Sequence, residues 1–489
     1  MSLSRRDLLR LLGGSAAAGA LWACGGAAPR AAARRSDPED VRRALRDAVA
    51  TVRGAFPAAS GWAALRTRTS LIAASGARGT ATEVTATVVL RAQSRGGAVL
   101  ERVGADATPA AIAALAAELA ARGGDGGGTL DPGPPIAHLA TVAVDPAATE
   151  PASWLAPLDA ILARTLEQGS SRIVWQAAHG VIDDESAWTI ADGVDVARRT
   201  VRVTTGVSAM AWSGNRPMLG EVVRGQAAGV EALALPDAAI TRATAQALEL
   251  LTPGDVPAGE VAVVLDPSVT AALLARGVAA VATSGAWTMP DLAARARLGQ
   301  TIAAADVTVV DDPTSGGFAG YAVDDEGQAA APLTLVDRGV LAAVLCDAHG
   351  ARRTGLPRTG HGRRRPGDGA ATATASDLTM TAGAADDDAL LEAIGDGLLI
   401  EDALGAAVDP RRWQVVVRAA RARRVVRGRL SGHVWGDVEL RGEVPALLGG
   451  VTAIGAATAT RIGDDDGLPS SVTAPAVATR GLITPRRSS

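Results

Sequence analysis

The densest group of side chains that could do chemistry lies in one short segment, CDAHGARRTGLPRTGHGRRR, at residues 346–365. Cys346 and His349 have the Cys-x-x-His spacing of a metal half-site, and Asp347 and His361 are further potential ligands. The spacing alone is a weak signal, because no second pair flanks it at the distance that zinc sites use. The alternative is a buried Cys346 followed by a solvated loop.

Three arginines close the same segment. Guanidinium groups bind carboxylates in bidentate geometry, so Arg363 and Arg364, with Arg365 beside them, are candidates for holding a substrate carboxylate. Solvated loop side chains are the competing interpretation.

Two runs of carboxylates are candidates for acid–base work or for calcium binding. Asp324, Asp325 and Glu326 precede Gly327, and this order favours a turn in which the glycine takes a positive φ. The second run, at residues 464–466, favours a solvated loop. The sequence contains neither a Gly-x-Ser-x-Gly elbow nor a glycine pattern that would cradle a phosphate.

A further segment has the layout of a site but lacks the side chains for one. Residues 260–265 alternate and are β-branched, Asp266 can cap a helix, and Pro267 suits a first helical position. Such a strand–helix junction often presents chemistry from the first turns of the helix. Between residues 271 and 281, however, the only polar side chain is Arg276.

The elements that must position these residues predict an α+β fold. Strand-like segments followed by a helix occur twice in the N-terminal half, which predicts two β-meander-plus-helix units with the helices on one face of each sheet. After a Pro- and Gly-containing boundary at residues 252–260, short strands joined by Asp/Gly turns predict a β-rich C-terminal domain with an inserted strand–helix unit. The expected helices cover residues 40–52, 108–123, 236–251 and 386–397, and the expected strands of the second unit include residues 137–144, 171–181 and 186–212.

Length and charge limit the classes of function. The 489 residues are enough for two or three domains, and 52 acidic side chains slightly outnumber 48 basic ones, all of them arginine. Outside the segment at residues 346–365 the arginines form no basic cluster, which argues against nucleic acid binding. We divide the chain into a signal at residues 1–24, a tether at 25–40, an N-terminal α+β region at 41–252 and a C-terminal β-rich domain at 253–489.

The first 24 residues resemble a twin-arginine export signal. Arg5 and Arg6 precede a short apolar run that is too short and too rich in glycine to span a membrane comfortably. The phrase LWAC resembles a lipoprotein cleavage box with Cys24 as the lipidated residue, which would tether the protein to a membrane in the periplasm or cell envelope. Cys346 would then have no partner for an intramolecular disulfide. The alternative is a cytoplasmic N-terminal helix.

Several phrases of the C-terminal half together resemble the TldD/PmbA (TldE) family of metallopeptidases and their partner subunits. PAGEVAVVLDP, LGQTIAAADVTVVDDPTSGGF and VDDEGQAAAPLTLVDRGVLAAVLCDAHGARRTGLPRTGHGRR follow the family in order and spacing. The N-terminal strands and helix resemble the family more loosely, and the resemblance covers the chain from about residue 45 to its end.

The resemblance implies a zinc motif that this chain has lost. Metal-bearing members carry His-Glu-x-x-x-His on the helix after the VVLDP strand, and this places Ala275 and Ala280 at the histidine positions and Arg276 at the glutamate. Methyl and guanidinium groups bind no zinc, and arginine takes no proton from water near neutral pH. The C-terminal phrase IGDDDGLPSSVTAPAVATRGLI also contains no cysteine in place of the family's thiolate ligand.

These losses favour an exported, catalytically inactive PmbA/TldE-type protein that needs no cofactor. It would bind unstructured peptides or pair with a metal-bearing TldD-type subunit, as a hetero- or homodimer. Two alternatives remain open. One is an active metallopeptidase with a metal site relocated to His349 and His361, and the other is a stand-alone surface binding lipoprotein.

Overall fold

The computed structural model describes residues 37–123, 126–214, 216–252, 254–293, 296–465 and 467–485. Arg5, Arg6 and Cys24 lie outside these ranges, so the predicted export signal and lipidation site stay predictions. Within the described ranges, no helix combines the length and the apolar character needed to cross a bilayer.

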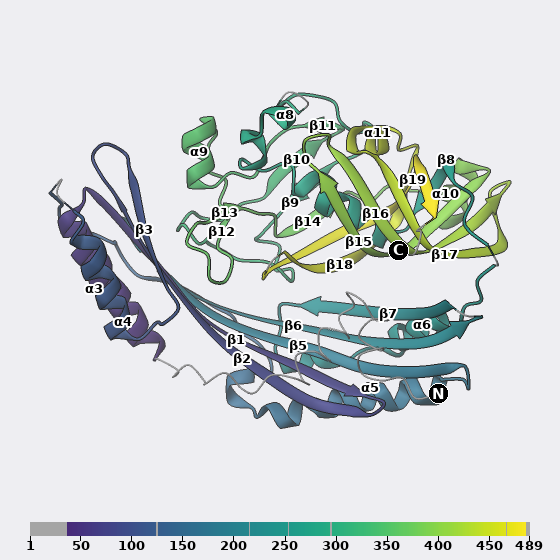
Figure 1. Cartoon of the computed structure of the whole chain (residues 1–489), viewed down its shortest axis with the longest axis horizontal. Helices are drawn as coiled ribbons and strands as arrows, with labels where there is room; N and C mark the ends of the chain where they lie inside the picture. Colours follow the sequence, from purple (N-terminus) through teal and green to yellow (C-terminus); the bar gives the residue numbers. More distant parts are fainter. Residues whose placement is uncertain are drawn as a thin grey trace.

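One seven-stranded sheet dominates the N-terminal region (Figure 1). Its order is β3-β2-β1-β5-β6, and β4 and β7 share the edge of β6 opposite β5. We expected one sheet in each unit, but β1 pairs with β5 over fifteen residues and joins the two units into one sheet. The strands are β1 (Ala58–Ala74), β2 (Ala77–Gln93), β3 (Val99–Gly104), β4 (Ile136–Leu139), β5 (Ile173–Ala191), β6 (Val194–Ser213) and β7 (Arg216–Gln226).

The helices of this region pack on one face of the sheet, as predicted. Odd-numbered residues of β1 pack against these helices. Ala59 and Ala63 belong to the hydrophobic core under the first two helices, and Leu71 and Ala73 belong to the core under the other two. The fourth strand expected at residues 137–144 is shorter than predicted and ends at Leu139. The helices are α3 (Pro38–Ala55), α4 (Pro109–Ala120), α5 (Leu155–Gln168) and α6 (Asp237–Leu248).

The opposite face of the same sheet meets the C-terminal half. Because side chains alternate along a strand, the even-numbered residues of β1 point away from the helices. Trp62 and Arg66 donate hydrogen bonds to Asp325 (3.2 Å) and to the carbonyl of Gly467 (2.9 Å). The sheet therefore separates a layer of helices from the C-terminal region (Figure 1).

Five strands of the C-terminal region close into a ring. β8, β15, β16, β17 and β19 pair in that order, and β19 pairs back onto β8. β18 and β14 also pair with β19, and β14 continues through β9 to β10 and β11. The strands are β8 (Gly259–Leu265), β9 (Val309–Asp311), β10 (Leu333–Asp337), β11 (Val340–Leu341), β12 (Gly362–Arg363), β13 (Thr372–Ala373), β14 (Asp377–Met380), β15 (Gly397–Asp409), β16 (Gln414–Val426), β17 (Arg429–Glu443), β18 (Ala453–Asp465) and β19 (Leu468–Pro485).

Five short helices accompany these strands, namely α7 (Pro267–Leu273), α8 (Pro290–Ala293), α9 (Ala348–Thr354), α10 (Asp387–Ile394) and α11 (Val444–Gly449). The predicted strand–helix unit is β8 followed by α7, and the boundary predicted at residues 252–260 extends from the link between the two sheets into the first two residues of β8. The division of the chain into the predicted domains stays a prediction.

Helix α7 begins where the sequence predicts. The carboxylate of Asp266 accepts a hydrogen bond from the N–H of Val269 (2.8 Å), and Pro267 occupies the first turn. The apolar residues after it form the centre of the C-terminal core, because Val269, Leu273 and Leu274 are fully buried. The helix then widens into a π-turn over residues 274–279.

Candidate functional site

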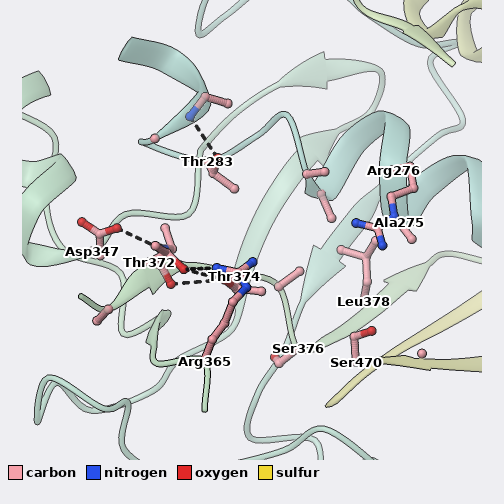
Figure 2. Close-up of a pocket in the computed structure, with 18 of the residues that line it drawn as sticks. Ala275, Arg276, Thr283, Asp347, Arg365, Thr372, Thr374, Ser376, Leu378 and Ser470 are labelled. Atoms are coloured by element: carbon pink, nitrogen blue, oxygen red, sulfur yellow. Dashed lines mark hydrogen bonds between the residues drawn. The ribbon is translucent and has the colours of Figure 1, made fainter. Parts of the chain in front are cut away.

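A cavity of about 1170 Å³ lies where the two halves of the chain meet. Its walls come from the α7 helix and its π-turn, from the segment around β13 and β14, from the neighbouring ends of β18 and β19, and from the β2–β3 hairpin of the N-terminal sheet. Figure 2 shows Ala275 and Arg276 on the helix across from Leu378 and Ser470.

The positions that the resemblance assigns to the zinc motif all line this cavity. Ala275, Arg276 and Ala280 are among its lining residues. In a regular α-helix, residues five apart point in different directions, since each residue turns the chain by about 100°. Here the N–H of Ala280 bonds to the carbonyl of Ala275 (3.2 Å), so the π-turn brings the two residues onto the same side. The backbone therefore presents an i, i+5 pair toward the cavity.

The side chains at this position do not fit a zinc ion. Two methyl groups offer no electron pair, and the guanidinium of Arg276 would repel a divalent cation. Among the described residues, no three His, Cys, Asp or Glu side chains gather into a group that could hold a metal. No catalytic step through zinc can be derived from these residues.

The four potential ligands of the segment at residues 346–365 lie apart. Cys346 is buried before α9, where burial raises the pKa of its thiol, and His349 lies exposed on α9 at the rim of the cavity. His361 is fully buried, with Nδ1 2.8 Å from the carbonyl of Thr359 and Nε2 3.0 Å from Asp311. The relocated metal site around His349 and His361 thus lacks a cluster of ligands in the described part of the chain.

The solvated loop that we weighed as the alternative holds only for the middle of the segment, where His349, Arg352 and Arg353 are exposed. Arg363 and Arg364 are both buried, and their guanidinium carbons lie 5.4 Å and 5.8 Å from the ring centroids of Tyr321 and Trp62. Arg363 also donates to the carbonyl of Pro469 (2.8 Å). These contacts hold the segment in place, and neither residue is in the cavity lining.

A substrate contact by Arg363 or Arg364 therefore stays a prediction. Their neighbour Arg365 does line the cavity and donates to the hydroxyl of Thr372 (2.9 Å; Figure 2).

The acidic run before Gly327 forms the predicted turn, but its carboxylates are buried. Gly327 has a φ of +81°. Asp324 accepts hydrogen bonds from the N–H groups of Gln328 (2.8 Å) and Gly362 (3.0 Å), while burial raises its pKa to about 6. Asp325 binds the N-terminal sheet. Asp324 and Asp325 therefore form a structural joint, meaning that their carboxylates connect segments of the fold, and they are not an exposed acid–base site.

The second acidic run is only partly described. Asp464 is exposed at the end of β18 and accepts a hydrogen bond from Arg68 (3.1 Å), whereas Asp466 lies outside the described residues.

Arg461 is a cavity residue that no local sequence pattern indicated. It lies on β18 and faces the same space as Arg276. In the sequence it is one arginine among many, and only the register of β18 against β19, where Arg461 pairs with Val472, places it at the cavity.

Comparisons with known proteins agree with this layout. Residues 258–483 match the family described as the PmbA/TldA metallopeptidase C-terminal domain. Over 276 residues the chain is 29% identical to a metalloprotease of Methanothermobacter thermautotrophicus, and over 210 residues it is 28% identical to a metalloprotease of Methanocaldococcus jannaschii. These matches cover 56% and 43% of this chain, and they span only 60% and 46% of the relatives' lengths.

Two solved structures share the fold. TldE from Thermococcus kodakarensis is 14% identical with a TM-score of 0.72 and covers 90% of this chain and 100% of its own. A protein from Thermotoga maritima described as a modulator of a DNA gyrase is 17% identical with a TM-score of 0.70. This match covers 87% of the present chain and 96% of the Thermotoga protein. The α+β architecture is therefore that of these proteins. Residues 258–483 are therefore similar to the PmbA/TldA metallopeptidase C-terminal domain, and the chain shares the fold of TldE.

Proposed function

We propose that this chain is a peptide-binding subunit of the TldD/PmbA type that does not itself carry zinc. The observation that supports the proposal is the position of Ala275, Arg276 and Ala280, which line a cavity of about 1170 Å³ without offering a metal ligand. A space of this size exceeds the range of about 300–1,000 Å³ that is usual for small-molecule sites, so it suits a segment of peptide.

The proposed partner is a relative that retains the His-Glu-x-x-x-His motif. Two archaeal relatives of this chain are described as metalloproteases, and a structural neighbour is named TldE. In this proposal the motif-bearing subunit supplies the metal and the water that attacks the peptide bond. The present chain binds unstructured peptide and completes the enclosed space.

Metal content and activity test the proposal together. The chain is purified alone and with a motif-bearing relative from the same genome, zinc is measured by mass spectrometry, and cleavage of an unstructured peptide is followed. We expect no stoichiometric zinc in this chain, no cleavage by it alone, and faster cleavage when it is added to the relative. Equimolar zinc together with unaided cleavage would contradict the proposal and favour an active peptidase.

We also propose export through the twin-arginine route and anchoring through lipid on Cys24. The support is the sequence of residues 1–24 alone. Replacing Arg5 and Arg6 by Lys should retain the protein in the cytoplasm, whereas Cys24→Ser should release it from membranes into the soluble envelope fraction. Unchanged fractionation of both variants would contradict the proposal.

A further inference from the structure

The helix at the cavity presents small apolar side chains on one side. Four alanines between residues 272 and 280 line the cavity, namely Ala272, Ala275, Ala279 and Ala280. Their spacing follows the turn of a helix, so they form one face, on which Arg276 is the only polar side chain. We call these four alanines the alanine face.

The opposite side of the same helix is fully packed. Leu273, Leu274 and Val278 are completely buried in the C-terminal core. A Cβ added at Gly277 would lie 2.9 Å from Cγ2 of Val444, so this side has no spare room. The helix therefore places its large apolar side chains in the core and leaves its small ones at the cavity.

Apolar residues from three strands of the C-terminal sheet line the cavity as well. Leu378 on β14 and Val472 on β19 are buried in the core, and Ala406 and Val408 on β15 pack against it. Figure 2 shows Ala275 and Leu378 on the same side of the cavity. Within the described part of the chain, no Phe, Tyr or Trp lines the cavity. The hydrophobic core therefore reaches the cavity surface here through short side chains.

The other side of the cavity is polar. Arg365 donates to the hydroxyl of Thr372 (2.9 Å), the hydroxyl of Thr374 donates to the carbonyl of Thr372 (3.2 Å), and Asp347 accepts from a backbone N–H of β13 (2.8 Å; Figure 2). A wholly apolar ligand would take water from these groups without replacing its hydrogen bonds, which costs free energy. A peptide suits both sides, because its backbone is polar and its side chains can be apolar.

We propose that the alanine face is an apolar subsite that binds one large apolar side chain, such as that of leucine or phenylalanine, of a peptide in this cavity. Methyl groups leave room for such a side chain, and its burial against them removes apolar surface from water. This inference rests on the proposed function in one respect, namely that the ligand is a peptide. The packing of the helix and the division of the cavity into an apolar and a polar side stand independently of it.

Binding of matched peptides tests the subsite. Three fluorescently labelled peptides share one polar sequence with both ends blocked, and they differ at one central position, which is serine, leucine or phenylalanine. Binding is followed by anisotropy. For wild type we expect the leucine and phenylalanine peptides to bind about tenfold more tightly than the serine peptide, because one apolar side chain is buried. Equal binding of all three peptides would overturn the subsite and leave peptide binding intact.

Filling the alanine face should remove this preference. Ala275→Leu and Ala280→Leu each place a large side chain at a partly buried position of the cavity wall. Ala304→Leu is the matched control, because Ala304 is also partly buried and packs on the same core without lining the cavity. We expect the control to keep the preference and both filled variants to bind the three peptides equally.

Two outcomes of the variants are decisive. Thermal unfolding shows which variants are folded, and either filled variant is sufficient for the test. If a folded filled variant keeps the preference of wild type, the apolar side chain binds elsewhere and the assignment to the alanine face is wrong.

An apolar dye decides the case in which no peptide binds. Nile red fluoresces more strongly in apolar surroundings, and we expect increased emission with wild type and Ala304→Leu and not with the two filled variants. That result without peptide binding would support the apolar site and contradict the proposed function. The same emission with all four proteins would overturn the site.

Displacement of the dye separates a peptide from an acyl chain. Dodecanol is the probe for an acyl ligand, because it has a long apolar chain and no amide groups. We expect the leucine peptide to displace Nile red from wild type at a lower concentration than dodecanol does. The reverse order would show that the apolar site takes an acyl chain and would overturn the proposal.

Discussion

The carboxylate of Asp325 accepts a hydrogen bond from the guanidinium of Arg198 and so connects the two halves of the chain. Arg198 lies on β6 of the N-terminal sheet, and Asp325 lies in the turn before β10. Trp62 and the N–H of Arg364 (2.7 Å) also donate to the same carboxylate. The cavity is built from both halves, so this joint helps to hold its walls together.

Removing that joint should lower stability strongly. Asp325→Ala removes the nearer of the two carboxylates that pair with Arg198 and leaves only Glu185, at 3.4 Å. It also removes the acceptor of Trp62 and Arg364, and breaking a buried pair costs about 3–5 kcal/mol. The free energy of unfolding in urea measures the loss. Glu260→Gln is the control, because Glu260 is exposed and 3.8 Å from Arg480, and we expect a change within about 0.5 kcal/mol. Equal effects of the two variants would show that the joint is not structural.

The raised pKa of Asp324 should make stability depend on pH. The value of about 6 in the folded protein exceeds the ordinary 3.8, so the folded state binds the proton more tightly than the unfolded state. Protonation of Asp324 therefore adds to the free energy of unfolding below pH 4, and this stabilisation is lost as the pH rises through 6. The difference between the two limits is about 3 kcal/mol.

Asp324→Asn tests this dependence. The variant cannot titrate at that position, so the pH slope of its unfolding free energy between pH 4 and 6 should be flatter than that of wild type. Urea unfolding at four pH values in this range measures both slopes. Parallel slopes would mean that Asp324 keeps an ordinary pKa.

Much of the fold could be predicted from the sequence because its signals are local. The cap at Asp266 and the turn at Gly327 each depend on residues adjacent in the chain, and both are confirmed. The alternation of apolar and polar residues likewise indicated the β-meanders and the packing of the helices on one face of the sheet. Residues 155–168, an amphipathic helix that packs on β5, were missed because the strands around them dominated the interpretation.

The site was harder to predict because its parts are distant in sequence. Arg461 and Arg276 are 185 positions apart, and only strand register brings them to one cavity. His361 illustrates the reverse error. Its polar neighbours suggested solvent or metal, yet it is buried against Asp311, 50 residues away, which no local pattern reveals.

The stability of the fold should depend on glycine at position 327 for two separate reasons. Its φ of +81° disfavours any L side chain, and an added Cβ would lie 2.7 Å from Cγ1 of Val194 on β6. Gly299 is a matched control, with a φ of +83° and no atom within 4 Å of an added Cβ. We expect Gly299→Ala to cost about 1 kcal/mol and Gly327→Ala about 1–3 kcal/mol more, measured by urea unfolding. Equal costs would indicate that the turn moves away from β6.

The π-turn should still be able to present two metal ligands. Ala275→His with Ala280→His places imidazoles on one side of the helix at the cavity, because the i, i+5 hydrogen bond aligns these positions. Arg276→Glu in the same variant removes the repelling cation. We expect this triple variant to bind one zinc ion, more weakly than a four-ligand site, whereas Ala280→His alone binds none. Isothermal titration with zinc measures both. If the triple variant binds no zinc, then the π-turn does not hold the two positions together in solution, and the assignment of Ala275 and Ala280 to the lost motif fails with it.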